Sequence, residues 1–90
     1  MVAKLSDAEM AAKLLGRLKL VVAVSEDMPI ESKLEIQPML REVADTLALP
    51  LESQDTVRVR AYYDLMLEAS DTDPNVEALL KALRNFVPYL

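Results

Sequence analysis

The sequence has 90 residues, of which 52% are hydrophobic and 28% are charged, and its mean hydropathy is +0.14. It is long enough for one small domain over residues 1–90 and too apolar to remain disordered. It contains no cysteine, no histidine and only one glycine. These absences exclude disulfides, thiolate and imidazole catalysis, zinc sites built from Cys and His, and phosphate-binding loops that need several glycines. We expect no cofactor.

Acidic residues outnumber basic ones by 15 to 10, which gives a net charge of −5 at pH 7. The charge is uneven, because residues 25–52 hold seven acidic and two basic residues, whereas residues 1–24 hold two acidic and four basic ones. Nonspecific nucleic-acid binding depends on clustered Lys and Arg, so we expect no nucleic-acid partner. The basic first segment and the acidic second one can pair within a bundle or between subunits.

No stretch of the sequence has the length of a membrane span. The longest apolar run, residues 20–24, has five residues, whereas crossing a bilayer takes about 20. Acidic residues occur from Asp7 onward, in contrast to the basic start of a signal peptide. We therefore expect a cytoplasmic protein with no membrane partner.

A helix is predicted over residues 7–24. Ser6 and Glu9 have the spacing of a capping box, in which each side chain accepts from the other residue's backbone N–H. The apolar residues that follow recur at helical spacing, from Met10 to Val22. The β-branched residues of segment 18–24 also allow a strand there, which is the alternative interpretation.

A second helix is predicted after the turn at residues 25–29, with Asp27 as its cap and Pro29 in its first turn. Pro38 falls in the middle of its apolar stripe. Because proline lacks the N–H donor and clashes with the preceding turn, we expect it to kink this helix or split it into residues 29–37 and 38–48.

A third helix is predicted from a cap at Ser53 or Asp55 to about Ala69. Segment 56–63 also alternates apolar and polar residues, as a half-buried strand does. Strands near 18–24 and 56–63 would give a small α/β domain. The helical interpretation is favoured because no glycine is present at the turns and because strong helix formers continue the segment.

The last helix is predicted to begin with Asp73 as cap and Pro74 as first residue, and to end at Pro88. Together these elements predict an all-α fold, a compact irregular bundle of four to five helices. Short turns marked by proline join them.

Neither a metal site nor an active site is predicted. Asp71, Asp73 and Asn75 match the first ligands of a calcium-binding EF-hand loop, but Val76 stands where its glycine is needed and Ala82 where its glutamate is needed. The paired carboxylates along the helices are interpreted as solvated surface charge. We expect that the protein is not an enzyme.

The strongest candidates for partner binding combine aromatic and arginine residues, which are enriched at interface hot spots. One group lies in the third predicted helix and the other at the apolar C-terminal end: Arg58, Arg60, Tyr62 and Tyr63, then Phe86, Tyr89 and Leu90. The alternative interpretation of the first group is one core tyrosine, one surface tyrosine and two solvated arginines. The C-terminal group can equally close the chain's own core.

The function favoured by the sequence is that of a non-catalytic protein–protein interaction module that associates with itself. A chain of 90 residues with 52% hydrophobic residues has more apolar surface than so small a core can cover. The alternative is a small regulatory or antitoxin-type protein whose acidic segment, residues 26–52, masks a basic partner. No small-molecule substrate is indicated.

Overall fold

The computed structural model describes residues 5–90 and contains four α-helices and one short 3₁₀-helix. These are α1 (Asp7–Val24), α2 (Ile30–Leu47), η1 (Leu51–Ser53), α3 (Thr56–Ala69) and α4 (Pro74–Leu83). No residue in this range forms a strand, so the all-α prediction is confirmed and the alternative with strands near 18–24 and 56–63 is wrong. Residues 1–4, on which the targeting prediction partly depends, lie outside the described residues.

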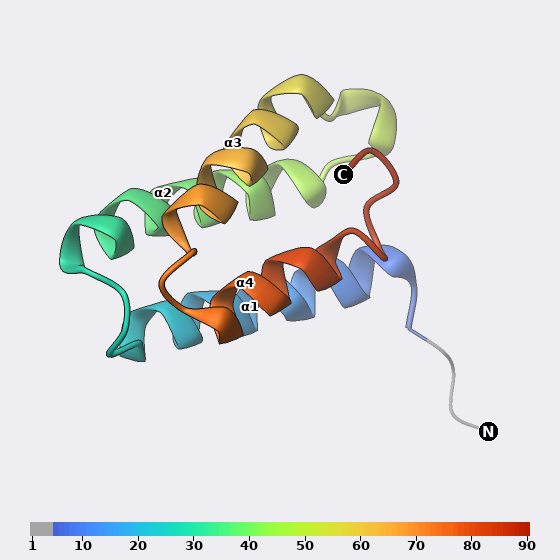
Figure 1. Ribbon diagram of the computed structural model, residues 1–90. Coiled ribbons are helices and arrows are strands. Elements are labelled where there is room, and N and C mark those ends of the chain that lie inside the picture. The colour runs from blue at the N-terminus through green and yellow to red at the C-terminus, as the bar shows by residue number, and fades with distance from the viewer. Residues whose placement is uncertain (1–4) are drawn as a thin grey trace.

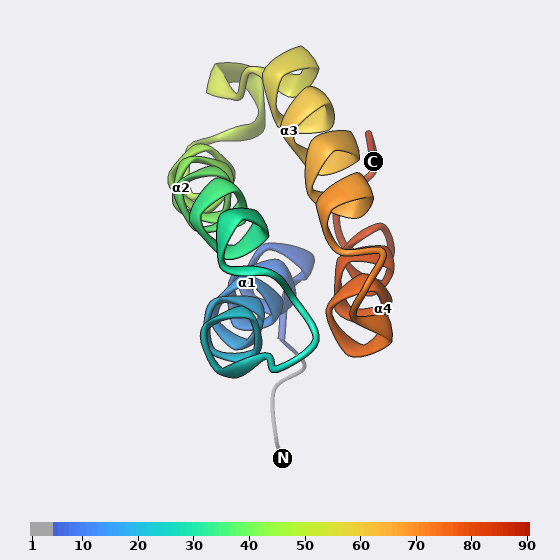
Figure 2. The ribbon, with the colours of Figure 1, turned by 60° about the vertical axis from the view of Figure 1, so that its left-hand side comes forward.

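The four helices form a closed ring in which each packs against two others. Helix α1 contacts α2 and α4, and α3 contacts the same two helices from the opposite side. Figures 1 and 2 show α1 beside α4 and α2 beside α3. The bundle is flattened, with principal extents of 39 × 33 × 16 Å. A flattened shape exposes more surface for its volume than a sphere does, which leaves part of the apolar content uncovered.

Side chains cap three of the helices where the sequence predicts them. Ser6 Oγ accepts from the Glu9 N–H at 3.2 Å, and Glu9 Oε1 accepts from the Ser6 N–H at 3.3 Å. Asp55 accepts from the Arg58 N–H at 3.1 Å at the start of α3. Asp73 caps α4, directly before Pro74. The predicted helix starts at these positions are confirmed.

Helix α2 differs from its prediction in two ways. It begins after Pro29, and Asp27 does not cap it. It also runs without interruption through Pro38, so of the two predicted outcomes, a kink or a split, the split into residues 29–37 and 38–48 is wrong. A proline inside a helix costs about 3 kcal/mol, but the helix buries four large apolar side chains worth about 1.5–3 kcal/mol each, namely Ile36, Met39, Leu40 and Val43. Their packing on both sides of Pro38 holds the helix together.

The core lies inside the ring and receives apolar side chains from all four helices, including Leu18, Val43, Val59 and Leu80. Helix α4 ends at Leu83, earlier than the predicted stop at Pro88. The chain turns there because the N–H groups of Phe86 and Val87 both donate to the Leu83 carbonyl, at 3.1 and 3.2 Å. No helix among residues 5–90 is both long enough and apolar enough to cross a membrane.

A buried polar contact joins the two turns at one end of the bundle. Ser25 Oγ donates to Asp73 Oδ2 at 2.5 Å and accepts from the Met28 N–H at 3.2 Å. The other carboxylate oxygen of Asp73 accepts from the Asn75 and Val76 N–H groups. The hydrogen bond from Ser25, helped by these two N–H groups and opposed by burial, lowers the pKa of Asp73 below its ordinary value of 3.8.

Candidate functional site

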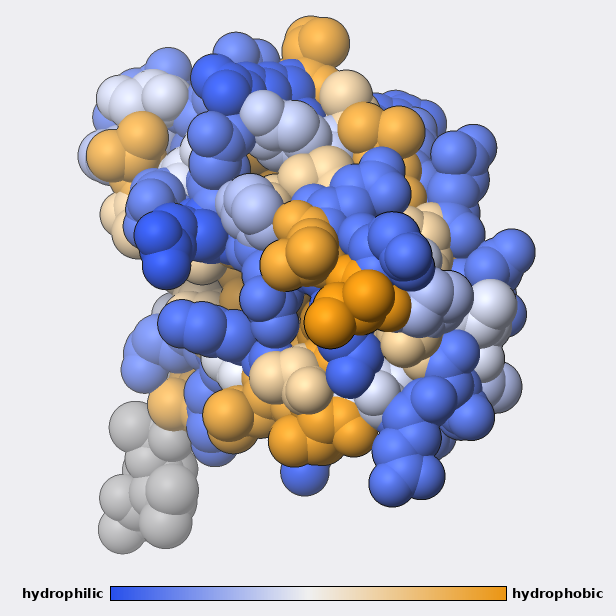
Figure 3. All heavy atoms as spheres, turned by 90° about the vertical axis from the view of Figure 1, so that its left-hand side faces the viewer, coloured by the Kyte–Doolittle hydropathy of each residue, from blue (hydrophilic) through white to orange (hydrophobic). Residues whose placement is uncertain are grey.

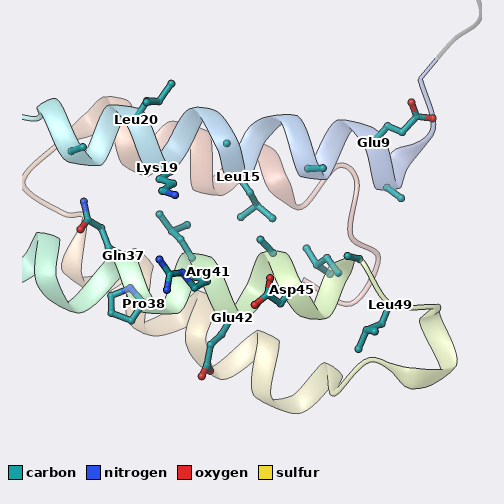
Figure 4. A pocket seen from close by; sticks show the side chains of 18 of the residues that line it. Glu9, Leu15, Lys19, Leu20, Gln37, Pro38, Arg41, Glu42, Asp45 and Leu49 are labelled. Carbon is teal, nitrogen blue, oxygen red and sulfur yellow. The ribbon is translucent and has the colours of Figure 1, made fainter.

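A groove with a volume of about 1230 Å³ lies between α1 and α2. Both helices line it over most of their length, as Figure 4 shows. Helices α1 and α2 touch along their inward faces, where Leu15 and Leu40 are buried. The groove lies between the two helices on the surface of the bundle, and these two leucines form its floor.

Large apolar side chains line the groove while exposed to solvent. Leu20 is 68% exposed, Leu34 is 66% exposed and Leu49 is 48% exposed. Two more exposed apolar residues, Val24 and Ile30, flank the turn between α1 and α2. Figure 3 shows this end of the molecule, with hydrophobic side chains gathered over its middle and lower part. An apolar surface of this kind marks an interaction site more often than does a scatter of single residues.

The groove exists because α1 carries small residues where it faces outward. Ala8, Ala12 and Gly16 occur at every fourth position, which places them on one side of the helix, and all three are exposed. A Cβ atom added to Gly16 would meet nothing within 4 Å. Packing within the chain therefore does not require a glycine here, although glycine inside a helix costs about 0.5–1 kcal/mol relative to alanine.

The charged residues of the groove are segregated along its length. Lys19 and Arg41 lie at the same level, Asp45 lies further along, and Glu9 lies toward the opposite end (Figure 4). Within residues 5–90, Lys19, Arg41 and Asp45 make no ion pair shorter than 4 Å. Glu42, by contrast, is used within the chain, because it accepts from Arg58 at 3.0 Å. One part of the groove is thus basic and the next part is acidic.

The predicted group on α3 divides between the core and the surface. Tyr63 is 1% exposed and its hydroxyl donates to the Leu80 carbonyl at 2.7 Å, so its side chain is not accessible to a partner here. Tyr62 is half-buried and accepts from Arg58, and this contact, with the nearby Glu42, raises the pKa of Arg58. Arg58 and Arg60 are exposed. These positions match the alternative interpretation given for this group.

The predicted C-terminal group lies against the chain's own core. Phe86, Tyr89 and Leu90 are all half-buried and pack against the buried cluster. The Tyr89 hydroxyl donates to Gln54 Oε1 at 2.6 Å, which fixes the C-terminal segment to the loop before α3. The structure therefore does not join this group and the α3 group into one free surface, and partner binding by the exposed members stays a prediction.

No group of three or more carboxylates with the geometry of a metal site occurs among the described residues. Asp73 is committed to capping α4 and to Ser25. The carboxylate pair Glu31 and Glu35, like the pair Asp64 and Glu68, lies exposed on the outside of a helix. Comparison of the chain with protein-family models, with curated proteins and with solved structures finds no significant match.

The sequence contains a signal for the groove. Leu20 and Val24 fall outside the apolar stripe of the first helix, and Gly16 lies on the same side of the helix as Ala8 and Ala12. A lone glycine in a strongly predicted helix, flanked at i−4 by a small residue and at i+4 by a large apolar one, indicates a second face of α1 that the chain's own core does not use.

Proposed function

We propose that the protein is a non-catalytic protein–protein interaction module that associates with a second copy of itself through the groove between α1 and α2. The observation that supports the proposal most is the exposure of Leu20, Leu34 and Leu49 along one continuous apolar groove. Burying a large apolar side chain contributes about 1.5–3 kcal/mol. Covering these residues is therefore favourable, and no segment among residues 5–90 covers them, since all three remain exposed.

The groove has the form that accepts the apolar side chains of a helical surface. It is long, apolar at its base and lined by two parallel rows of side chains, and amphipathic helices bind in grooves of this type. The chain has no histidine or cysteine for imidazole or thiolate catalysis, and its carboxylate pairs on α2 and α3, Glu31 with Glu35 and Asp64 with Glu68, are exposed outside the groove. An interaction role therefore explains the groove better than a catalytic one does.

The first test is the mass of the protein in solution by size-exclusion chromatography with light scattering at micromolar concentration. We expect a dimer for the wild type and a monomer for Leu34→Glu. Each copy loses about 1.5 kcal/mol of apolar burial, and a symmetric dimer contains the contact twice, so the Kd should rise about 100-fold.

The matched control is Val57→Glu. Val57 is 80% exposed on α3 and does not line the groove, so this variant should remain a dimer. A wild-type protein that stays monomeric throughout the micromolar range would refute self-association. A dimer that Val57→Glu disrupts and Leu34→Glu does not would place the interface elsewhere.

A further inference from the structure

The charges that line the groove are complementary to themselves after a half-turn. We propose, on the basis of the self-association argued above, that two copies dock antiparallel about a two-fold axis across the groove. In this arrangement Arg41, in the basic part of each groove, faces Asp45, in the acidic part of the other. The occupant of each groove is thus the second copy's α1–α2 face.

The order of charges supports an antiparallel arrangement. Because the basic level at Arg41 is followed along the groove by the acidic level at Asp45 (Figure 4), a two-fold axis between the two levels places opposite charges together twice. A two-fold axis running along the groove would instead place Arg41 opposite the partner's Lys19, which lies at the same level (Figure 4), and like charges in contact oppose binding. The isologous interface that results is the commonest type in homodimers.

Lys19, Arg41 and Asp45 make no ion pair among the described residues, and this supports the same partner. Lys19 and Arg41 lie at one level without an ion pair among residues 5–90. Two neighbouring positive charges repel each other, and the repulsion is relieved when a carboxylate faces them. Within its own chain, Asp45 also lacks a cationic partner closer than 4 Å in the described range. A second copy provides a carboxylate for the basic part of the groove and a cation for Asp45.

The apolar residues have a compatible arrangement. Leu20 and Leu34 line the groove near the turn between α1 and α2, and Leu49 lines the other end, beyond the C-terminus of α2. The same half-turn that pairs the charges brings one apolar end onto the other. Near the middle, Gly16 has open space where a Cβ would stand, so the backbones of the two copies can approach closely there.

The decisive experiment uses two charge-reversal variants, Arg41→Asp and Asp45→Arg. In the proposed dimer each variant alone places like charges together at both contacts, so each should dimerise at least about tenfold more weakly than the wild type. Mixed in equal amounts, they restore opposite charges at both contacts. Native mass spectrometry of the mixture should therefore show the heterodimer in excess over both homodimers.

The control variants carry the same changes on another helix. Arg60 and Asp64 on α3 have the same residue types and the same spacing as Arg41 and Asp45, and both are exposed outside the groove. Arg60→Asp and Asp64→Arg should dimerise like the wild type, alone and mixed. Circular dichroism of each variant checks that the helices are retained.

The outcomes separate this proposal from the one on which it rests. A wild-type monomer refutes self-association itself. A dimer that Leu34→Glu disrupts but that tolerates Arg41→Asp, or that gives no excess of heterodimer on mixing, keeps the interaction module and overturns the antiparallel docking. A dimer that responds to Arg60→Asp and not to Arg41→Asp overturns the docking and moves the interface to α3.

Discussion

Replacing Tyr63 by phenylalanine tests the packing at the end of α4. In a continuing α-helix the Arg84 N–H would donate to the Leu80 carbonyl, but α4 ends at Leu83 and the Arg84 N–H donates to Lys81 instead, at 3.2 Å. The Tyr63 hydroxyl donates to the Leu80 carbonyl at 2.7 Å. Tyr63→Phe keeps the ring in the core and removes only this donor.

The expected cost follows from the burial of the pair. Tyr63 and Leu80 are 1% and 0% exposed, so water cannot replace the lost hydroxyl, and a buried acceptor left without its partner costs about 1–3 kcal/mol. For a chain of this size each kcal/mol lowers the melting temperature by about 4–8 °C. Urea unfolding followed by circular dichroism should give a lower free energy of unfolding with an unchanged m-value.

The neighbouring tyrosine provides the control. Tyr62 makes its hydrogen bonds with Arg58 at the surface of α3, so Tyr62→Phe should stay within about 0.5 kcal/mol of the wild type. Equal losses of unfolding free energy in the two variants would show that the buried hydrogen bond to Leu80 contributes no more than the surface hydrogen bonds of Tyr62. A Tyr63→Phe variant as stable as the wild type would contradict the interpretation that this hydrogen bond stabilises the C-terminal end of α4.

Three further predictions concern pH and the groove. Because the pKa of Asp73 is lowered, its contribution to stability is present above its ordinary pKa and is lost as the pH falls through the folded-state value; Ser25→Ala should cost about 1–3 kcal/mol near neutral pH and flatten this acid dependence in urea titrations. Burial raises the pKa of Tyr63 and Tyr89, so stability should be full below about pH 10 and fall as the pH rises further; without its hydroxyl, Tyr63→Phe should show a smaller alkaline loss. Gly16→Ala, made in the monomeric Leu34→Glu background, should stabilise the chain by about 0.4–1 kcal/mol, because the added Cβ meets no atom within 4 Å; a destabilised variant would contradict the open geometry at this position.

Local chemistry explains why the helix starts could be predicted. Ser6, Asp55 and Asp73 each cap a helix through bonds to N–H groups within three residues. Such contacts depend only on neighbours in the sequence, so the residue types and their spacing are enough to locate them. The same holds for the choice of helix over strand on α3, where strong helix formers continue beyond the alternating segment.

The errors arose where distant packing overrides local preference. Pro38 breaks a helix when nothing else holds it, but here the buried residues on both sides keep α2 continuous. The early end of α4 also depends on tertiary structure, since Val87 turns back into the core and is 4% exposed. Neither the continuity of α2 nor the early end of α4 can be predicted from the position of a proline or the spacing of apolar residues. Each depends on which other part of the chain the segment packs against.

The groove could not be located from residue types alone, for a related reason. Aromatic and arginine residues are enriched in interfaces, which draws attention to Arg58 and the tyrosines of α3, but the same residue types also form the bonds inside this chain. A surface free for a partner is distinguished by side chains that remain exposed or without a hydrogen-bond partner after folding. Tyr63 and Tyr89 have their hydrogen-bond partners, whereas Leu20 and Leu34 keep most of their surface in water.

Helices α2 and α3 allow a direct comparison between a charged pair that lines the groove and a charged pair that lies outside it. Each helix carries an exposed arginine followed four residues later by an exposed aspartate, Arg41 and Asp45 on α2 and Arg60 and Asp64 on α3. Sequence patterns favour the α3 pair, because it lies beside tyrosines, whereas the structure favours the α2 pair, because it lines the apolar groove. Composition and local spacing are the same for the two pairs, so any difference in their effect on dimerisation measures the contribution of the groove.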